Sequence, residues 1–147
     1  MNFPFFNRLQ LKKIVVPASA AAGQRAEKIL AGIVQELPDL LLTYLVDTQS
    51  GALLAFYTAS STYNPNLLSL RNNKLLRTMQ EALATKAWVG GPLTDVSIIL
   101  EDQIHHLRPL DVPEGTWYCF IATRLADANL GMVKEVMRRC TVAAVPA

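Results

Sequence analysis

The sequence predicts an α+β fold, in which a five-stranded and mostly antiparallel sheet carries helices on both faces. Apolar residues recur every three or four positions in three separate segments, which is the spacing of amphipathic helices. Five short runs rich in aromatic, aliphatic and β-branched residues are joined by short polar turns, as antiparallel strands are. Several runs are apolar on both faces, so helices must cover both sides of the sheet and create three layers. The predicted element order is α-β-β-α-β-β-β-α.

The first part of the chain contains the first helix and a hairpin. Helical spacing runs from Ala22 to Leu37 and ends there, because Pro38 disfavours the helical conformation in the residue before it. The runs 40–46 and 52–57 flank a polar turn that closes on a glycine. This pattern predicts two strands joined as a hairpin.

A long helix follows the hairpin. Asn64 is a favourable N-cap residue, and Pro65 occupies the first helical position, where its missing N–H removes no helical hydrogen bond. We expect the helix to extend through Trp88 and to end at the two glycines and the proline of 90–92.

Three strands and a last helix complete the predicted domain. The runs 95–100 and 104–110 are separated by a short acidic turn and form a second hairpin. The run 117–123 is aromatic and β-branched throughout, so it is the strongest strand candidate in the chain. Asp127 or Asn129 is expected to cap the last helix.

Composition limits the class of protein. A length of 147 residues favours one domain, placed at residues 21–145 after an N-terminal extension of residues 1–20. The hydrophobic share of 51% excludes a largely disordered chain, and the formal net charge of +2 argues against a general nucleic-acid binder. No apolar run is long enough to span a membrane, and basic residues follow the Phe-rich start instead of preceding it. We therefore expect cytoplasmic residence and no membrane partner.

Few residues suggest catalysis. His105 and His106 are neighbours on a predicted strand, so their side chains point to opposite faces and cannot chelate one ion together. Cys119 beside one of these histidines is the one conceivable nucleophile pair, but a thiol in the middle of an apolar strand is expected to be buried and unreactive. Glu101 and Asp102 are interpreted as a solvated turn. Because glycine-rich phosphate motifs are also absent from the sequence, we expect no enzymatic activity, no cofactor and no metal.

Short motifs and the element order point to a known family. Residues 127–133, Asp-Ala-Asn-Leu-Gly-Met-Val, follow the strongest predicted strand, and residues 37–40, Leu-Pro-Asp-Leu, precede the first strand. The turn of the first hairpin closes at Gly51. These features resemble, respectively, the Asn-Leu-Gly signature, the Ile-Pro-Gly-Val turn and the Asp-Gly hairpin of the roadblock (dynein light chain) domain family. The element order matches this family from Ala21 to Ala144.

The resemblance implies a dimer with a non-catalytic role. Roadblock domains pair their third strand, here Asp95–Leu100, with the same strand of a second copy, and their long helices, here Asn66–Trp88, pack side by side. Such pairing would close an apolar edge strand that is otherwise open to aggregation. Members of the family act as interaction platforms, and many regulate Ras-like small GTPases in bacterial polarity and gliding systems or attach cargo to dynein. The interface residues implied here are Leu75, Met79, Leu83, Val96, Ile98 and Leu100.

A basic surface is the candidate site for the partner. Arg71, Lys74 and Arg77 are expected on the outer face of the long helix, where they would meet an acidic surface such as that of a small GTPase. The residues leave open whether the dimer forms between identical chains or with a paralogue.

A small-ligand sensor is the alternative function, because mixed α/β sheets of this size also enclose ligand pockets. This alternative requires a closed cavity inside one copy of the chain. The candidate lining residues are aromatic: Trp117, Tyr44 and Phe56. Tight packing of side chains in that space would exclude it.

Overall fold

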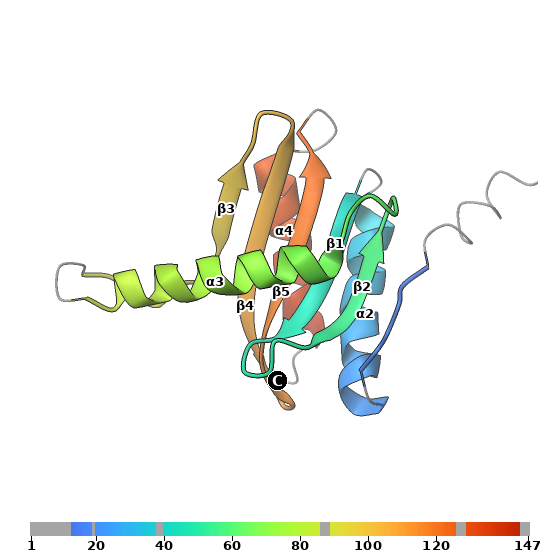
Figure 1. Cartoon of the computed structure of the whole chain (residues 1–147), viewed down its shortest axis with the longest axis horizontal. Coiled ribbons are helices and arrows are strands. Elements are labelled where there is room, and N and C mark those ends of the chain that lie inside the picture. Colours follow the sequence, from blue (N-terminus) through green and yellow to red (C-terminus); the bar gives the residue numbers. More distant parts are fainter. Residues whose placement is uncertain (1–12, 19, 38–39, 86–88, 126–128, 145–147) are drawn as a thin grey trace, which may run out of the picture.

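The computed structural model describes residues 13–18, 20–37, 40–85, 89–125 and 129–144, and its elements follow the predicted order (Figure 1). Within these residues the chain is an α+β fold, as predicted. The elements are α2 (Ala20–Glu36), β1 (Leu40–Asp47), β2 (Leu53–Thr58), α3 (Pro65–Leu83), β3 (Val96–Ile99), β4 (Gln103–Val112), β5 (Gly115–Arg124) and α4 (Leu130–Ala144).

The strands form one five-stranded sheet in the order β2-β1-β5-β4-β3, and every neighbouring pair is antiparallel. β5, the strand with the strongest sequence signal, lies in the centre and is buried from Trp117 to Thr123. Because β5 is central, β1 and β4 are both paired on two sides. The two edge strands are therefore β2 and β3, which are also the shorter ones.

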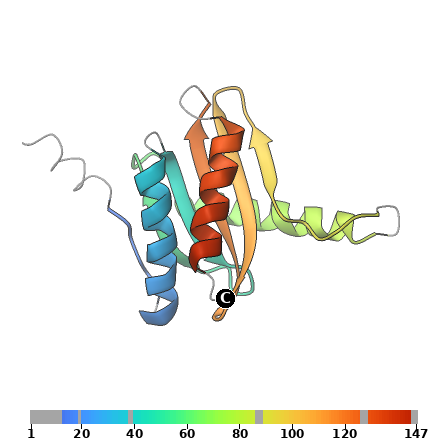
Figure 2. The same ribbon diagram turned by 180° about the vertical axis from the view of Figure 1, so that it is seen from behind.

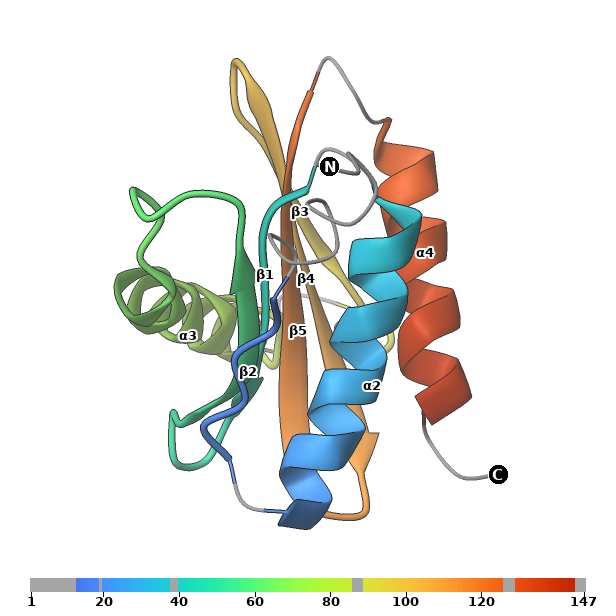
Figure 3. The same ribbon diagram turned by 90° about the vertical axis from the view of Figure 1, so that its right-hand side faces the viewer.

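Helices cover both faces of the sheet, which gives the predicted three layers. α2 and α4 lie side by side on one face, and α3 crosses the other (Figures 2 and 3). Trp117 belongs to the core beneath α2 and α4, whereas Tyr44 and Phe120 belong to the core beneath α3. Among the helices of the described residues, none is long and apolar enough to cross a membrane.

The predicted start of α3 is confirmed, but its predicted end is wrong. The Oδ1 atom of Asn64 accepts hydrogen bonds from the backbone N–H groups of Asn66 and Leu67 at 3.0 and 3.2 Å, as an N-cap does. The helix ends at Leu83, before the glycines at 90 and 91. Ala84 donates to the carbonyl groups of both Gln80 and Glu81, and this bifurcated bond tightens the last turn.

The other predicted boundaries differ by few residues. α2 begins at Ala20, two residues before the first apolar position of its stripe. Asn129 caps α4, because its Oδ1 atom accepts from the N–H of Met132 at 2.7 Å. Trp88 itself and the alternative cap residue Asp127 lie outside the described residues.

The attachment of α3 to the sheet can be tested on two leucines of this helix. Leu76 is 4% exposed in the core, whereas Leu70 is 67% exposed. We expect Leu76→Ala to lower the free energy of unfolding by about 2–5 kcal/mol, because it leaves a cavity under the helix. Leu70→Ala should change it by no more than about 0.5 kcal/mol. Urea unfolding of both variants measures this difference, and equal effects would contradict the described orientation of α3.

Candidate functional site

The exposed edge of β3 is the first part of the candidate site. Within the described residues, β3 pairs with β4 on one side, with Ser97 opposite His106 and Ile98 opposite His105. The N–H of Leu100 donates to the carbonyl of Gln103 at 2.9 Å. Hydrogen-bonded pairs alternate along an antiparallel ladder, so the backbone groups of Ile98 point toward β4 and those of Ser97 and Ile99 point away from it. These outward groups can bind the backbone of another strand.

The predicted interface side chains lie around this edge. Val96 is only 7% exposed and belongs to the core beneath α3, whereas Leu100 is 40% exposed. Ile98 and Met79 are half-buried and pack against the same core. Figure 1 shows that α3 runs across the sheet and projects beyond β3. The remaining two positions, Leu75 and Leu83, are also half-buried.

The outer face of α3 is the second part of the candidate site. Leu67 and Leu70 are 65% and 67% exposed. Lys74 and Arg77 are also exposed, and they follow Leu70 by four and seven residues, which places them on the same side of the helix. An apolar side chain on an amphipathic helix is normally expected in the core, but the structure places Leu67 outside it.

The buried face of α3 is unusually polar. Asn72 is fully buried, and its Nδ2 atom donates to the hydroxyl of Tyr44 at 2.7 Å. That hydroxyl lies 3.0 Å from the hydroxyl of Tyr118, which donates to the carbonyl of Ser69 at 3.2 Å. Burial raises the pKa of Tyr118 to about 12 and raises the pKa of Tyr44 further. Both phenols therefore stay protonated, and this hydrogen-bonded chain, the tyrosine network, attaches α3 to the sheet.

Arg71 differs from the other two predicted basic residues. Its Nη2 atom lies 2.8 Å from Oδ1 of Asn72 and 3.1 Å from Nδ1 of His105. Because a guanidinium can only donate, Nδ1 of His105 accepts, and Nε2 carries the proton that is donated to Oε1 of Gln103 at 2.8 Å. Arg71 thus joins α3 to β4 while its side chain stays exposed, as those of Lys74 and Arg77 do.

His106 lies on the opposite face of the sheet from His105, as predicted. It is fully buried, and its Nε2 atom donates to a carboxylate oxygen of Asp95 at 3.0 Å. Nδ1 then accepts from the hydroxyl of Ser97 at 2.7 Å, and Arg108 binds both oxygens of Asp95 at 3.2 Å. In a Ser-His-Asp catalytic triad, Nε2 of the histidine faces the serine and Nδ1 donates to the aspartate, which is the reverse of the arrangement here. We therefore interpret this cluster as a link between β3 and β4.

The cysteine–histidine pair considered from the sequence does not form. Both ring nitrogens of His105 and of His106 are bonded to residues other than Cys119. Burial raises the pKa of the Cys119 thiol far above its usual range, so the reactive thiolate is suppressed. Within the described part of the chain, no group of three or more His, Cys, Asp and Glu residues is placed to hold a metal ion.

The closed cavity required by a small-ligand sensor is not formed by the predicted residues. Trp117 packs beneath α2 and α4, whereas Tyr44 and Phe56 pack on the opposite face of the sheet. Since the sheet separates them, the three aromatic rings cannot line one cavity. Trp117 and Tyr44 are also completely buried among neighbouring side chains.

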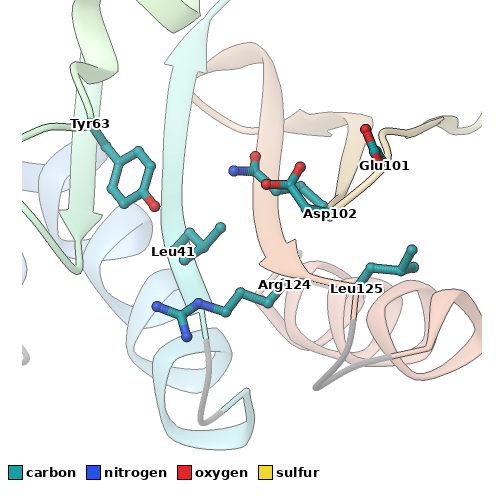
Figure 4. A pocket seen from close by; sticks show the side chains of 7 residues that line it. Leu41, Tyr63, Glu101, Asp102, Arg124 and Leu125 are labelled. Carbon is teal, nitrogen blue, oxygen red and sulfur yellow. The ribbon is translucent and has the colours of Figure 1, made fainter.

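An open groove of about 640 Å³ lies where the β3–β4 turn approaches the end of β5 (Figure 4). Figure 4 shows the side chain of Arg124 directed toward Leu41, with Asp102 on the opposite wall. The groove-lining residues are Leu41, Tyr63, Glu101, Asp102, Gln103, Arg124 and Leu125. Glu101 and Asp102 are exposed, as expected for a solvated turn. The walls lack the mostly apolar enclosure that is typical of small-molecule sites.

Comparison with known proteins identifies the fold. No protein-family model matches the sequence, and no curated protein matches it. A Roadblock/LC7 domain from Streptomyces avermitilis has a similar structure, with a TM-score of 0.60 and 16% identity over 78% of this chain and 90% of that chain. The chain has the roadblock fold, and the sequence-based prediction of this fold is confirmed.

Structures of MglB are similar over more of the chain. The gliding protein MglB from Thermus thermophilus has a TM-score of 0.69 and 17% identity, over 88% of this chain and 92% of that chain. A structure of MglB with a tetrameric arrangement has a TM-score of 0.71 and 20% identity, over 88% and 91% of the two chains. The shared feature is the fold of the whole described domain.

The two histidines predict a pH dependence of stability. Burial, assisted by the charge of Arg71, lowers the pKa of His105 to about 4, and burial also lowers the pKa of His106. The histidines bind protons near pH 6.5 in the unfolded chain and only at lower pH in the folded chain. Their contribution to the free energy of unfolding is therefore fully present above pH 6.5 and is lost as the pH falls. We expect the free energy of unfolding to fall by about 2 kcal/mol between pH 7.5 and 5 because of His105, and to fall further because of His106.

Urea unfolding at both pH values measures this loss. His105→Gln retains a donor and an acceptor but does not titrate, so it should remove the part of the pH dependence that comes from His105, about 2 kcal/mol. A wild-type stability that is unchanged between the two pH values would contradict the buried, neutral state of both imidazoles.

Proposed function

We propose that this protein is a non-catalytic interaction module that binds and regulates a Ras-like small GTPase. The observation that carries the proposal is the inverted polarity of α3. This helix buries Asn72 and Ser69 while it exposes Leu67 and Leu70. Exposed leucines beside cations are typical of a surface that binds a protein partner, and no strand or helix among the described residues covers these two. The roadblock fold supports the choice of a GTPase as partner.

We also propose a homodimer in which β3 pairs with β3 of a second copy. The outward backbone groups of Ser97 and Ile99 support this arrangement, because an antiparallel partner strand would satisfy them. The projection of α3 beyond β3 would place the end of this helix, at Leu83, near the second copy. The two outer faces of α3 would then form one continuous surface across the dimer, so the partner would contact both copies.

The dimer can be tested at Ile99, whose side chain is 54% exposed. Ile99→Pro removes one outward N–H without removing a bond to β4, so we expect the dimer Kd to rise by about tenfold or more. Ile99→Ala is the matched control, since it keeps the N–H and should remain dimeric. Light scattering after size-exclusion chromatography measures both masses. A wild-type protein that is monomeric at micromolar concentration would contradict the proposed dimer.

The partner surface can be tested by charge reversal. Replacement of Arg71, Lys74 and Arg77 by Glu should abolish capture of a small GTPase from an extract of the native cell. Because Arg71 also bonds to His105, the double variant K74E/R77E is the more specific one, and it should reduce capture without a change in stability.

The matched control for charge reversal is K28E/K134E, which changes two exposed lysines on α2 and α4. This control should capture the GTPase as the wild type does. Quantitative mass spectrometry of the bound fraction measures each capture. If K74E/R77E captures as much GTPase as the control, the outer face of α3 is not the binding surface.

A further inference from the structure

The segment 13–18, here called the strap, runs along the outer edge of β2 (Figure 3). Val15 donates its N–H to the carbonyl of Phe56 and accepts from the N–H of Phe56, both at 2.9 Å. Alternate strap side chains face the core beneath α2 and are half-buried. These side chains are Ile14, Val16 and Ala18. The strap therefore has the alternation and the bonding of a short sixth strand.

A glycine on α2 allows the strap to lie close to the helix. A Cβ atom at Gly23 would come within 3.0 Å of the carbonyl oxygen of Ala18 and within 3.0 Å of Cγ1 of Val16. Real Cβ contacts are almost never shorter, so a side chain at this position would require the strap to shift by a few tenths of an ångström. The strap is thus held between the edge of β2 and the surface of α2.

The strap covers a strand edge that would otherwise be open. The N–H of Ala59 donates to the carbonyl of Leu41 at 2.9 Å. The backbone N–H and C=O of Tyr57, two residues earlier, therefore also point toward β1. Phe56 and Thr58 consequently direct their backbone groups away from β1. The strap satisfies Phe56, and without it this edge would present a row of free donors and acceptors, as the β3 edge does.

The outer side of the strap is itself a poor template for another strand. The strap is so short that it forms one bonded residue pair with β2, and it carries the exposed charge of Lys13. Pro17, two residues beyond Val15, has no N–H to donate on the β2 side, so the strap pairs no further along β2. A very short edge strand that carries a lysine is a usual means of blocking an edge. The strap therefore replaces an edge that accepts strands with one that does not.

We propose that the strap guards a second self-assembly edge, and that its displacement lets β2 pair with β2 of another copy. A second copy is the favoured occupant because antiparallel pairing of two identical edges is self-complementary about a two-fold axis. It also continues the same sheet. With the strap bound, the chain offers one open edge and forms a closed dimer. With the strap displaced, it offers two open edges, and alternating β3 and β2 contacts produce an open-ended filament of copies. Growth of this filament beyond two copies rests on the proposed β3 dimer, whereas the β2 contact itself does not.

Val15→Pro tests the proposal, because it removes the N–H that binds Phe56. We expect the weight-average mass to rise at least about twofold above that of the wild type, since each dimer gains new contacts. The matched control is Val15→Ala, which keeps the N–H and alters a side chain that is 43% exposed, so its mass should equal that of the wild type. Gly23→Ala is a second test, because its methyl group crowds the strap from the α2 side and weakens its attachment. It should also raise the mass.

A second substitution separates β2 pairing from general aggregation. Thr58→Pro removes an outward N–H of β2, so the double variant V15P/T58P should return to the wild-type mass. Light scattering gives the masses, and far-ultraviolet circular dichroism verifies that each variant is folded. Unchanged mass in both V15P and G23A would overturn the proposal. Larger assemblies that persist in V15P/T58P would also overturn it, because they would form through another surface.

The same series distinguishes this proposal from the proposed β3 dimer. If the wild type is a monomer, the β3 dimer fails, and V15P should then form a discrete dimer through β2. If the wild type is a dimer and V15P forms longer assemblies, both proposals are supported.

Discussion

The position of α3 depends on the tyrosine network, and most of the candidate site depends on the position of α3. This helix contributes few buried apolar side chains, and its contact with the sheet includes the hydrogen bonds of Asn72 and Ser69 to Tyr44 and Tyr118. Buried polar groups are strongly destabilising when they lose their partners. The network therefore favours one placement of the helix. That placement exposes Leu67 and Leu70 and carries the end of the helix beyond β3.

The two edges of the sheet differ in whether another segment covers them. β3 is left with outward backbone groups and is surrounded by half-buried apolar side chains, whereas β2 is covered by the strap through Val15. An uncovered strand edge is a hazard in an isolated protein, so a difference between the edges indicates a directed use of one of them. The hydrogen bonds among Ser97, His106 and Asp95 connect β3 to β4 and support the edge that stays open.

The fold could be predicted because its signals are local and repeated. Helical periodicity, the cap at Asn64 and the aromatic run in β5 each specify an element without reference to the rest of the chain. The end of α3 could not be placed in the same way. The glycines at 90 and 91 are a stronger stop signal than anything at Leu83, but the last turn tightens at Ala84 before they are reached.

The candidate site was less predictable, because it depends on which side chains meet across strands. Asp95 and Arg108 lie far apart in sequence and become neighbours through the register of the β3–β4 hairpin. That register could have been anticipated from the short turn at Glu101 and Asp102. The contacts of Arg71 with Asn72 and His105 could not, since a basic residue on an amphipathic helix is normally assigned to solvent alone. Nothing in the spacing of Leu70 distinguishes an exposed leucine from a buried one.

The polar attachment of α3 also restricts how this helix can move. Apolar contacts have no preferred direction, so a helix held by them alone can roll about its own axis at little energetic expense. Hydrogen bonds need aligned donors and acceptors, and those of Asn72 and Tyr118 therefore fix the roll of α3. Because Leu67 and Leu70 lie on the opposite side of the same rigid cylinder, the core tyrosines set the angle at which these leucines are presented to whatever lies outside.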